Sequence, residues 1–190
     1  MNIYDFDNTI YNGDTNRDII VYSIKRHPIN VIISLIKSKK LYKKYKKGLI
    51  EFKDVKEVML SFLFKINNLD EYLDKFVDKH LKNIKYWYYN QQKNDDVIIS
   101  ASYEIWIKKF CDRLGIKNVI ATKTDDNGKI IGKNLKGEEK VIEFKKRFNN
   151  EVVECAYSDA KIDLPMLGLA KKPYVVKGNK IIPYTKNYKF

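Results

Sequence analysis

The sequence predicts an open parallel α/β sheet with a helical segment inserted after the first strand. Short apolar runs alternate with segments of helical periodicity, which is the pattern of successive strand and helix units. Polar residues directly follow several apolar runs, as expected where strands end at the ligand-binding edge of such a sheet. A chain of 190 residues with 44% hydrophobic content is long and apolar enough for one core with a small insert.

The first element is a very short strand, predicted over residues 2–6. Its alternation ends in two carboxylates, Asp5 and Asp7. A buried strand interior does not tolerate two carboxylates, whereas the carboxyl end of a strand does. We therefore expect both acids at the mouth of the sheet.

Residues 14–94 are expected to form three or four helices. Their apolar residues recur three and four positions apart, as in Leu69, Leu73 and Phe76. The predicted domains are an α/β core of residues 1–13 and 95–190 and a helical cap domain of residues 14–94. A cap inserted at this point would cover the carboxyl edge of the sheet.

The next strand and helix follow the insert directly. Residues 97–100 form a continuous apolar run that ends in Ser100, which is typical of a strand buried on both faces. Ser102 is expected to cap the following helix and Gly115 to end it. This segment is therefore a strand, turn and helix unit.

The C-terminal third repeats this unit. Residues 118–121 predict a strand, residues 137–148 a helix, and residues 151–157 a strand that is followed by Asp159. Asp163, two residues before a proline, marks the start of another helix. A carboxylate is thus expected again at the carboxyl end of a strand.

Charge and hydropathy limit the classes of function. The longest stretch of the first third without a charged side chain, apart from histidine, is residues 27–36, and a transmembrane helix needs roughly 18 apolar residues. No secretory pattern precedes the first strand, so we expect a cytoplasmic protein without a transmembrane segment. The net charge of +13 favours an anionic partner, which is nucleic acid, an acidic membrane face or a phosphorylated substrate.

Asp5 and Asp7 suit phosphoryl chemistry. Asp5 can attack an electrophilic phosphorus, and Asp7 can transfer a proton to the leaving oxygen. Asp159 supplies a third carboxylate, and Asp163 a fourth unless it only caps the helix that follows. Oxygen ligands in this number suit Mg²⁺, and zinc is not expected without His or Cys nearby.

A transferred phosphoryl group also needs hydrogen-bond donors and positive charge around its oxygens. The hydroxyl of Ser100 and the amide of Ala101 are placed to face the same mouth. Lys136 stands just before a helix, beside Gly137, where a cation can join an anion-binding site. The structural alternatives are an ordinary strand-ending serine and a solvated lysine.

Four segments of the chain resemble, in their order along the sequence, the four motifs of the haloacid dehalogenase superfamily. Lys136, which precedes a glycine, fits the third motif better than Lys140. The resemblance covers essentially the whole chain and is nearest to the phosphoserine-phosphatase-like branch (subfamily IB), which has a helical cap between its first and second motifs. The matching segments are Asp5-Phe6-Asp7-Asn8-Thr9, Val97-Ile98-Ile99-Ser100, Lys136 and Ser158-Asp159-Ala160-Lys161-Ile162-Asp163.

The resemblance implies a phosphatase that hydrolyses a phosphomonoester through an aspartyl-phosphate intermediate. Asp5 would be the nucleophile, Asp7 the general acid and then the general base, and Thr9 a support for the loop. Phosphate would be held by Ser100, Ala101 and Lys136.

The same resemblance implies Mg²⁺ as the cofactor. Its ligands would be the Asp5 side chain, the Asp7 backbone carbonyl and Asp159. Asp163 would act behind them, through water or through Lys136.

The second motif differs from that of phosphoserine phosphatases. Ser100-Ala101-Ser102 stands where Ser-Gly-Gly is usual, so specificity for phosphoserine is not implied. The Ser-Ala-Ser form resembles a sub-branch that includes lipid-phosphate phosphatases, so a lipid phosphate is one candidate among small phosphorylated substrates. The motifs do not separate a phosphatase from a phosphotransferase of the same fold.

A basic binding module, for nucleic acid or a membrane surface, is the non-enzymatic alternative. Residues 37–47 contain seven lysines and no acid, which would allow peripheral contact with an anionic membrane. The competing interpretation is a plain solvated helix face. Tyrosines alternate with lysines in the insert, but no recognised nucleic-acid motif accompanies them, so nucleic acid is not expected as a partner.

Overall fold

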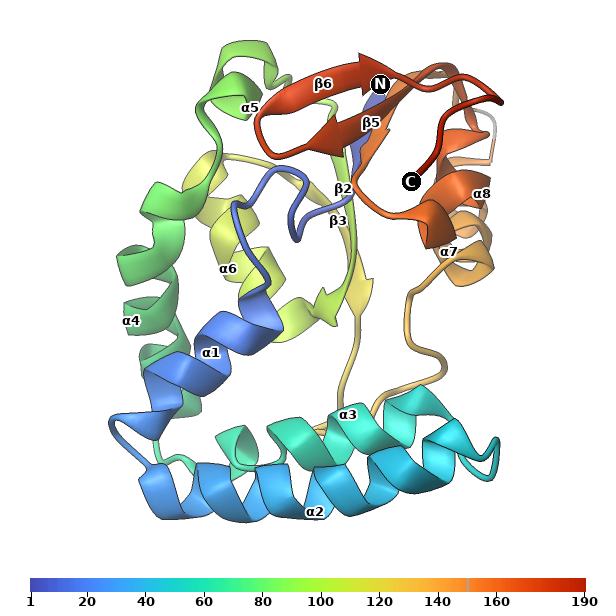
Figure 1. Ribbon diagram of the computed structural model, residues 1–190. Coiled ribbons are helices and arrows are strands. Elements are labelled where there is room, and N and C mark those ends of the chain that lie inside the picture. The colour runs from blue at the N-terminus through green and yellow to red at the C-terminus, as the bar shows by residue number, and fades with distance from the viewer. Residues whose placement is uncertain (150) are drawn as a thin grey trace.

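The computed structural model describes residues 1–149 and 151–190, and a six-stranded sheet lies at its centre (Figure 1). The strand order is β3-β2-β1-β4-β5-β6. Neighbouring strands from β3 to β5 are parallel, and β6 pairs antiparallel with β5, so the predicted parallel α/β sheet is confirmed. The strands are β1 (Asn2–Tyr4), β2 (Val97–Tyr103), β3 (Asn118–Thr122), β4 (Val153–Ser158), β5 (Ala170–Lys177) and β6 (Lys180–Pro183).

Helices cover both faces of the sheet, and each face has its own apolar core. Ile98 and Tyr4 belong to the core beneath α6 (Glu104–Leu114), whereas Ile3, Val97 and Ile99 belong to the core beneath α7 and α8. Neighbouring strand residues thus point to opposite faces, as the pleat of a strand requires. The second pair of helices is α7 (Glu138–Phe148) and α8 (Leu164–Leu167), and a 3₁₀ turn, η3 (Lys161–Asp163), precedes α8.

Five helices lie between β1 and β2. In Figure 1, α2 and α3 form a pair at the lower edge of the molecule, α1 leads to them from β1, and α4 and α5 run back along the sheet. The phenyl ring of Phe76 in α4 lies 6.0 Å from that of Phe110 in α6, so this helix packs on the core. The segment consists of α1 (Thr15–Ile24), α2 (Pro28–Lys46), α3 (Phe52–Leu60), η1 (Leu63–Lys65), α4 (Leu69–His80), η2 (Leu81–Asn83) and α5 (Tyr86–Gln91).

The division of the chain into a core of residues 1–13 and 95–190 and a cap of residues 14–94 stays a prediction. Among the described residues no helix is both long and apolar enough to cross a bilayer.

The unit that begins with β2 differs from the prediction at its turn. β2 continues beyond Ser100 to Tyr103, and α6 begins at Glu104. Ser102 therefore lies within the strand, and its hydroxyl bonds Asp7 instead of capping the helix. The predicted end of the helix is confirmed, because Gly115 adopts the left-handed conformation (φ 73°) that closes it.

We expect Phe110→Ala to lower the free energy of unfolding by about 3–5 kcal/mol, because it leaves a cavity where rings from several elements meet. The Phe110 ring is fully buried and lies 5.4 Å from the Phe6 ring and 5.5 Å from the Tyr11 ring. Urea unfolding followed by circular dichroism measures the change. The control is Tyr86→Ala, whose side chain is 79% exposed and whose effect should stay within about 0.5 kcal/mol.

Candidate active site

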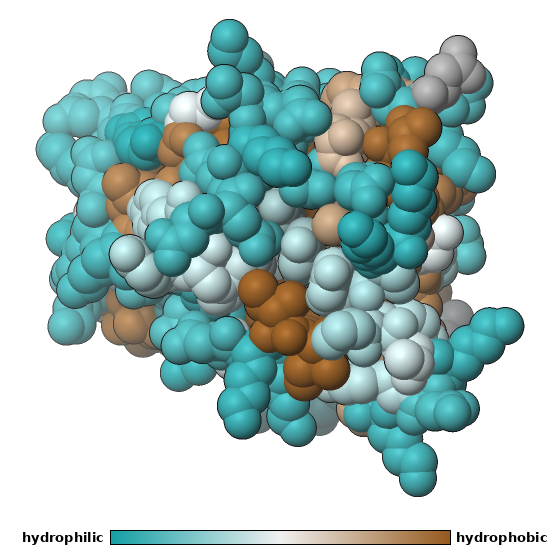
Figure 2. Space-filling model, turned by 90° about the horizontal axis from the view of Figure 1, so that it is seen from above, coloured by the Kyte–Doolittle hydropathy of each residue, from teal (hydrophilic) through white to brown (hydrophobic). Residues whose placement is uncertain are grey.

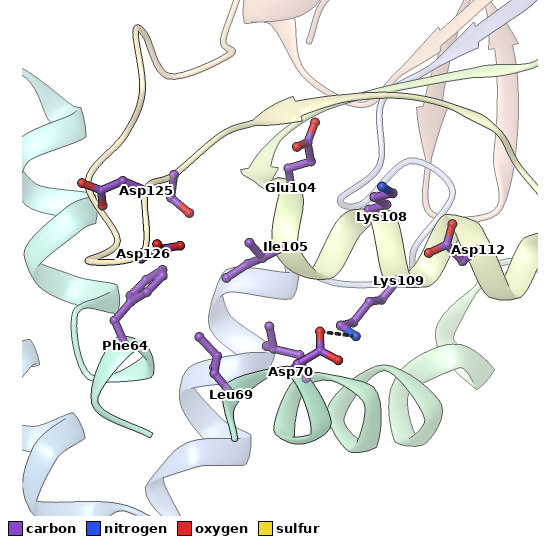
Figure 3. Close-up of a pocket in the computed structure, with 12 residues that line it drawn as sticks. Phe64, Leu69, Asp70, Glu104, Ile105, Lys108, Lys109, Asp112, Asp125 and Asp126 are labelled. Atoms are coloured by element: carbon purple, nitrogen blue, oxygen red, sulfur yellow. Dashed lines mark ion pairs between the residues drawn. The ribbon is translucent and has the colours of Figure 1, made fainter. Parts of the chain in front are cut away.

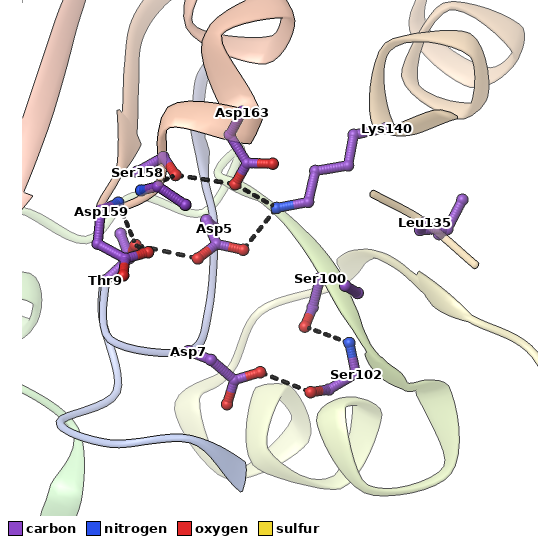
Figure 4. A network of polar contacts seen from close by, with 12 residues as sticks. Asp5, Asp7, Thr9, Ser100, Ser102, Leu135, Lys140, Ser158, Asp159 and Asp163 are labelled. Carbon is purple, nitrogen blue, oxygen red and sulfur yellow. Dashed lines mark hydrogen bonds and ion pairs between the residues drawn. The ribbon is translucent and has the colours of Figure 1, made fainter. Parts of the chain in front are cut away.

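The carboxyl ends of three parallel strands bring the motif residues together. β1 lies between β2 and β4, and Tyr4 is in register with Ile98 on one side and Tyr157 on the other. The Asp5 N–H donates to the Tyr157 carbonyl at 2.9 Å, so Asp5 is still tied to β4 after β1 has ended. The edge of the sheet therefore places Asp5, Ser100 and Asp159 on one side of the molecule (Figure 4).

Lys140 joins two of the aspartates. Its Nζ lies 2.6 Å from Oδ1 of Asp5 and 2.7 Å from Oδ2 of Asp163, and its side chain is only 2% exposed (Figure 4). Asp163 Oδ2 also accepts a hydrogen bond from the Ser158 hydroxyl at 2.8 Å. A buried ammonium group is tolerated only when it is paired in this way, so these contacts fix the position of α7 relative to the sheet.

Lys140, and not the predicted Lys136, pairs with Asp5 and Asp163, and the role of Lys136 in binding phosphate stays a prediction. Lys136 is exposed, precedes Gly137 (φ 60°), and holds its Nζ 5.9 Å from the centre of the Phe52 ring. Lys140 lies one turn inside α7, four residues before the buried Phe144, and so belongs to the buried face of the helix. That spacing is the feature of the sequence that could have identified it.

Asp163 does not act as a helix cap. It occupies the N-cap position of α8, but its side chain makes no capping hydrogen bond and pairs with Lys140 instead. Its second oxygen, Oδ1, is buried without a hydrogen-bond partner among the described residues. The alternative in which Asp163 only starts the helix is therefore wrong, and its contact is with Lys140, not with Lys136.

Thr9 connects the loop after β1 to the loop after β4. Its hydroxyl donates to Asp5 Oδ2 at 3.0 Å and accepts from the Asp159 N–H at 3.1 Å. The same hydroxyl lies 3.4 Å from Asp159 Oδ1. The Thr9 side chain therefore holds the carboxylates of Asp5 and Asp159 beside each other.

Asp7 is held by the helix that follows its loop and by β2. Its Oδ1 accepts the Thr15 N–H at 2.6 Å, and its Oδ2 accepts the Ser102 hydroxyl at 2.5 Å. Ser100 is fully buried, and its hydroxyl oxygen accepts the Ser102 N–H at 3.0 Å. Burial raises the pKa of Asp7 to about 6, although the Ser102 hydrogen bond opposes the shift. A carboxyl with this pKa exchanges protons readily near neutral pH.

The pKa values of Asp5 and Asp159 are shifted in the same direction as that of Asp7. Burial raises the pKa of Asp5 to about 7; Lys140 opposes this shift, and Asp163 and Asp159 add to it. Burial also raises the pKa of Asp159, and the negative charge of Asp163 adds to that effect. Burial alone would lower the pKa of Lys140, but its two aspartate partners raise it, so the ammonium stays charged.

The donor set fits Mg²⁺. When all are ionised, Asp5, Asp159 and Asp163 carry three negative charges against the one positive charge of Lys140, which leaves an excess of two. The side-chain atoms that could bind a metal ion here are all oxygens, which Mg²⁺ prefers as ligands. Among the described residues no three Asp, Glu, His or Cys side chains form a metal-binding group by themselves. The Asp5 and Asp159 carboxylates would therefore share the ion with backbone carbonyl, water or substrate oxygens.

A cavity of about 410 Å³ opens onto this constellation. One wall comes from α3, whose buried Lys56 donates to the Ala101 carbonyl at 2.5 Å and to Asn134 Oδ1 at 2.9 Å. Burial lowers the pKa of Lys56 to about 7, and Asp7 and Asp14 oppose the shift. Lys56 could not be identified from the sequence, since it belongs to no motif and its contact with Asn134 spans 78 residues.

A second pocket, of about 510 Å³, lies between α4, α6 and the loop after β3 (Figure 3). Phe64, Leu69 and Ile105 form its apolar lining, and Lys109 pairs with Asp70 at 2.7 Å. None of the motif residues is among the described residues that line this second pocket. The chemistry of the motifs is therefore concentrated at the smaller cavity.

Lys140→Met should lower the free energy of unfolding at neutral pH by about 3–5 kcal/mol, because it leaves two buried carboxylates without their cation. The matched variant Lys136→Met removes an exposed lysine and should change stability by no more than about 0.5 kcal/mol. Urea titrations in the presence of EDTA compare the two. Similar losses for both variants would contradict the assignment of Lys140 as the buried partner.

Known proteins resemble this chain in sequence and in fold. A family model described as haloacid dehalogenase-like hydrolase matches residues 3–168. A histidinol-phosphatase from Neisseria meningitidis serogroup C (strain 8013) is 25% identical over 197 residues, covering 92% of this chain and 88% of the relative.

Two solved structures share the fold. A protein of unknown function from Bordetella pertussis Tohama I has a TM-score of 0.71 at 16% identity, covering 91% of this chain and 87% of that one. A phosphoserine phosphohydrolase-like protein from Francisella tularensis subsp. tularensis SCHU S4 has a TM-score of 0.55 at 19% identity, covering 91% and 86%. The family match includes β1 from Ile3 onward, the whole of β2, β3 and β4, and all the aspartates described above. The chain therefore belongs to the haloacid dehalogenase-like hydrolase family.

Proposed function

We propose that this protein is a Mg²⁺-dependent phosphatase that hydrolyses a small phosphomonoester through a covalent phosphate on Asp5. The observation that supports this most is the pairing of the buried Asp5 carboxylate with Lys140 and Thr9, at the cavity that Asp7 also borders. No Ser, Cys or Thr among the described residues of this cavity stands beside a His base. The carboxylate is therefore the nucleophile that the site offers.

In the first step an Asp5 carboxylate oxygen attacks phosphorus, and the bond from phosphorus to the leaving alcohol oxygen breaks. Asp7 donates its proton to that oxygen as the bond breaks, and its raised pKa supports this role as an acid. Lys140 supplies positive charge to the phosphoryl group, and the Ser100 hydroxyl and Ala101 amide supply hydrogen bonds. Lys140 thus takes the part that the sequence had suggested for Lys136.

In the second step Asp7, now ionised, takes a proton from water, and the hydroxide attacks phosphorus. The acyl phosphate bond breaks, which releases inorganic phosphate and restores the Asp5 carboxylate. The hydrogen bonds from Ser102 and Thr15 hold the Asp7 carboxylate beside the cavity, which supports a role in both transfers.

Mg²⁺ would be held by the Asp5 carboxylate, the Asp7 backbone carbonyl and the Asp159 carboxylate, and it would neutralise negative charge on the phosphoryl oxygens. Thr9 orients Asp5 and Asp159 toward each other. Asp163 supports these residues by holding Lys140 in position through their ion pair.

The leaving group of the substrate would lie against α3 and the loop before α7. Phe52, Met59 and Ile162 give this part of the cavity an apolar side, and Asp14 and Lys56 give it both signs of charge. Such a lining suits a small leaving group with polar and apolar parts. A substrate screen should therefore include histidinol phosphate, phosphoserine and a short-chain lipid phosphate.

Asp5→Asn should reduce kcat by about a thousandfold or more, because the amide cannot form the acyl phosphate. The measurement is phosphate release from the best substrate of the screen, with acid-stable trapping of labelled enzyme as a second readout. Asp126→Asn, an exposed aspartate outside this cavity, is the matched control. Turnover near the wild-type rate in Asp5→Asn would refute the proposed nucleophile.

EDTA should abolish activity, and added Mg²⁺ should restore it. Asp159→Asn should raise the Mg²⁺ concentration for half-maximal activity by about ten- to a hundredfold, because one carboxylate ligand becomes a neutral amide. Titration calorimetry of Mg²⁺ with the free protein gives the same comparison without turnover. Full activity in EDTA would exclude the proposed cofactor role.

A further inference from the structure

The helix α2 has its apolar and polar side chains on unexpected sides. Toward the protein it buries Val31 together with Ser34 and Ser38, and the Ser34 hydroxyl lies 3.1 Å from that of Ser61, the residue that follows α3. Toward solvent it presents isoleucines at helical spacing that are between 43% and 73% exposed, namely Ile29, Ile32, Ile33 and Ile36. A surface helix of a monomer usually exposes few large apolar side chains in a row, so this outer face is suited to an apolar partner.

Lysines continue the same face. Lys40, Lys43, Lys44 and Lys47 lie 4, 7, 8 and 11 residues beyond Ile36, so they follow the isoleucines of the first turns on the same side. All four are exposed. Between Asp18 and Glu51 the chain contains no acidic residue, so this positive charge has no local counter-charge.

The position of α2 leaves this face accessible. In Figure 1 the helix forms the lower edge of the molecule, with α1 and α3 on its inner side. The opposite, upper face is seen in Figure 2, where hydrophilic residues predominate and apolar residues form small separate patches. The outer face of α2 therefore combines exposed isoleucines with clustered lysines at one end of the molecule.

We propose that the outer face of α2, defined as Ile29, Ile32, Ile33, Ile36 and the four lysines above, docks the protein on an anionic lipid bilayer. Isoleucines of an interfacial helix enter the boundary between head groups and acyl chains, and lysines bind anionic head groups. Charge complementarity selects this partner over a second copy of the chain, because two such faces would bring the lysines of both copies together.

Docking in this orientation would bring the site close to the membrane. α3 packs on the inner side of α2 and contributes Phe52, Lys56 and Met59 to the cavity beside Asp5. Packed helix axes lie about 10 Å apart, so one helix layer would separate the bilayer from the cavity wall. The docking itself does not depend on the proposed phosphatase reaction and is tested separately from it.

The test is cosedimentation of the whole protein with sucrose-loaded vesicles. Vesicles of phosphatidylcholine containing about 30% phosphatidylglycerol should bind the wild type at about 50 mM NaCl, and about 500 mM NaCl should weaken binding by screening. Vesicles of phosphatidylcholine alone should bind it far less. No binding to the anionic vesicles at low salt would overturn the proposal.

Two variants separate the parts of the surface. Replacing Lys40, Lys43, Lys44 and Lys47 with Gln should weaken partitioning about tenfold or more. The control removes the same charge elsewhere, at the exposed Lys177, Lys180, Lys186 and Lys189, and should bind nearly as the wild type does. Equal losses in the two quadruple variants would show a response to net charge alone and would overturn the site.

The apolar part is tested by changing Ile29, Ile32 and Ile36 to Ser, with Ile131, Ile142 and Val152 to Ser as the control set of similarly exposed residues. Only the first set should reduce vesicle binding, and both should keep the wild-type circular dichroism spectrum. Sedimentation velocity tests whether the protein dimerises, and a single-stranded RNA competitor tests whether nucleic acid binds the same surface. If the wild type forms a dimer that the α2 isoleucine variant abolishes, the partner is a second copy of the chain. If RNA with the same total charge as the vesicle lipid displaces the protein, the partner is RNA. Either result would overturn the bilayer as the partner.

Discussion

The buried ammonium of Lys140 is the constraint on which the rest of the site depends. It lies between Asp5, at the end of β1, and Asp163, at the start of α8, and so connects three segments that are far apart in the chain. An unpaired charge at this depth would cost several kcal/mol, which makes any other arrangement of the three segments unfavourable. The position of α7, the direction of Asp5 and the absence of a cap at α8 all follow from this one requirement.

Charge at the site is opposite to that of the chain as a whole. The protein has a net charge of +13, yet acidic groups outnumber the cations at the carboxyl edge of the sheet. The raised pKa values of Asp5, Asp7 and Asp159 share burial as their main cause, and the negative charge of a neighbouring aspartate adds to it at each. A divalent cation and a phosphate together would restore balance there, while the positive surface would attract anionic molecules from solution.

The helices between β1 and β2 have two different roles in the structure. Their inner residues complete the cavity, since Lys56 reaches from α3 to the Ala101 carbonyl in β2. The outer residues of α2 do not contribute to the core, because its isoleucines face solvent while Val31, Ser34 and Ser38 are buried on its inner side. The same segment is thus able to form one wall of the site and a separate contact surface.

The sequence alone determined the alternation of strands and helices and the positions of Asp5, Asp7 and Asp159 just after strand ends, because the period of apolar residues and the placement of carboxylates are local properties. It did not predict β5 and β6, it assigned Ser102 to a helix cap, it left open whether Asp163 caps α8, and it did not identify Lys140 as the buried lysine. Each of these depends on partners distant in the chain: Ser102 meets Asp7 across 95 residues, and Lys140 meets Asp5 across 135. Which lysine is buried is decided by the direction of α7 after the turn at Gly137, and only the tertiary structure sets that direction, because the pairing energy exists only when all three segments are in place.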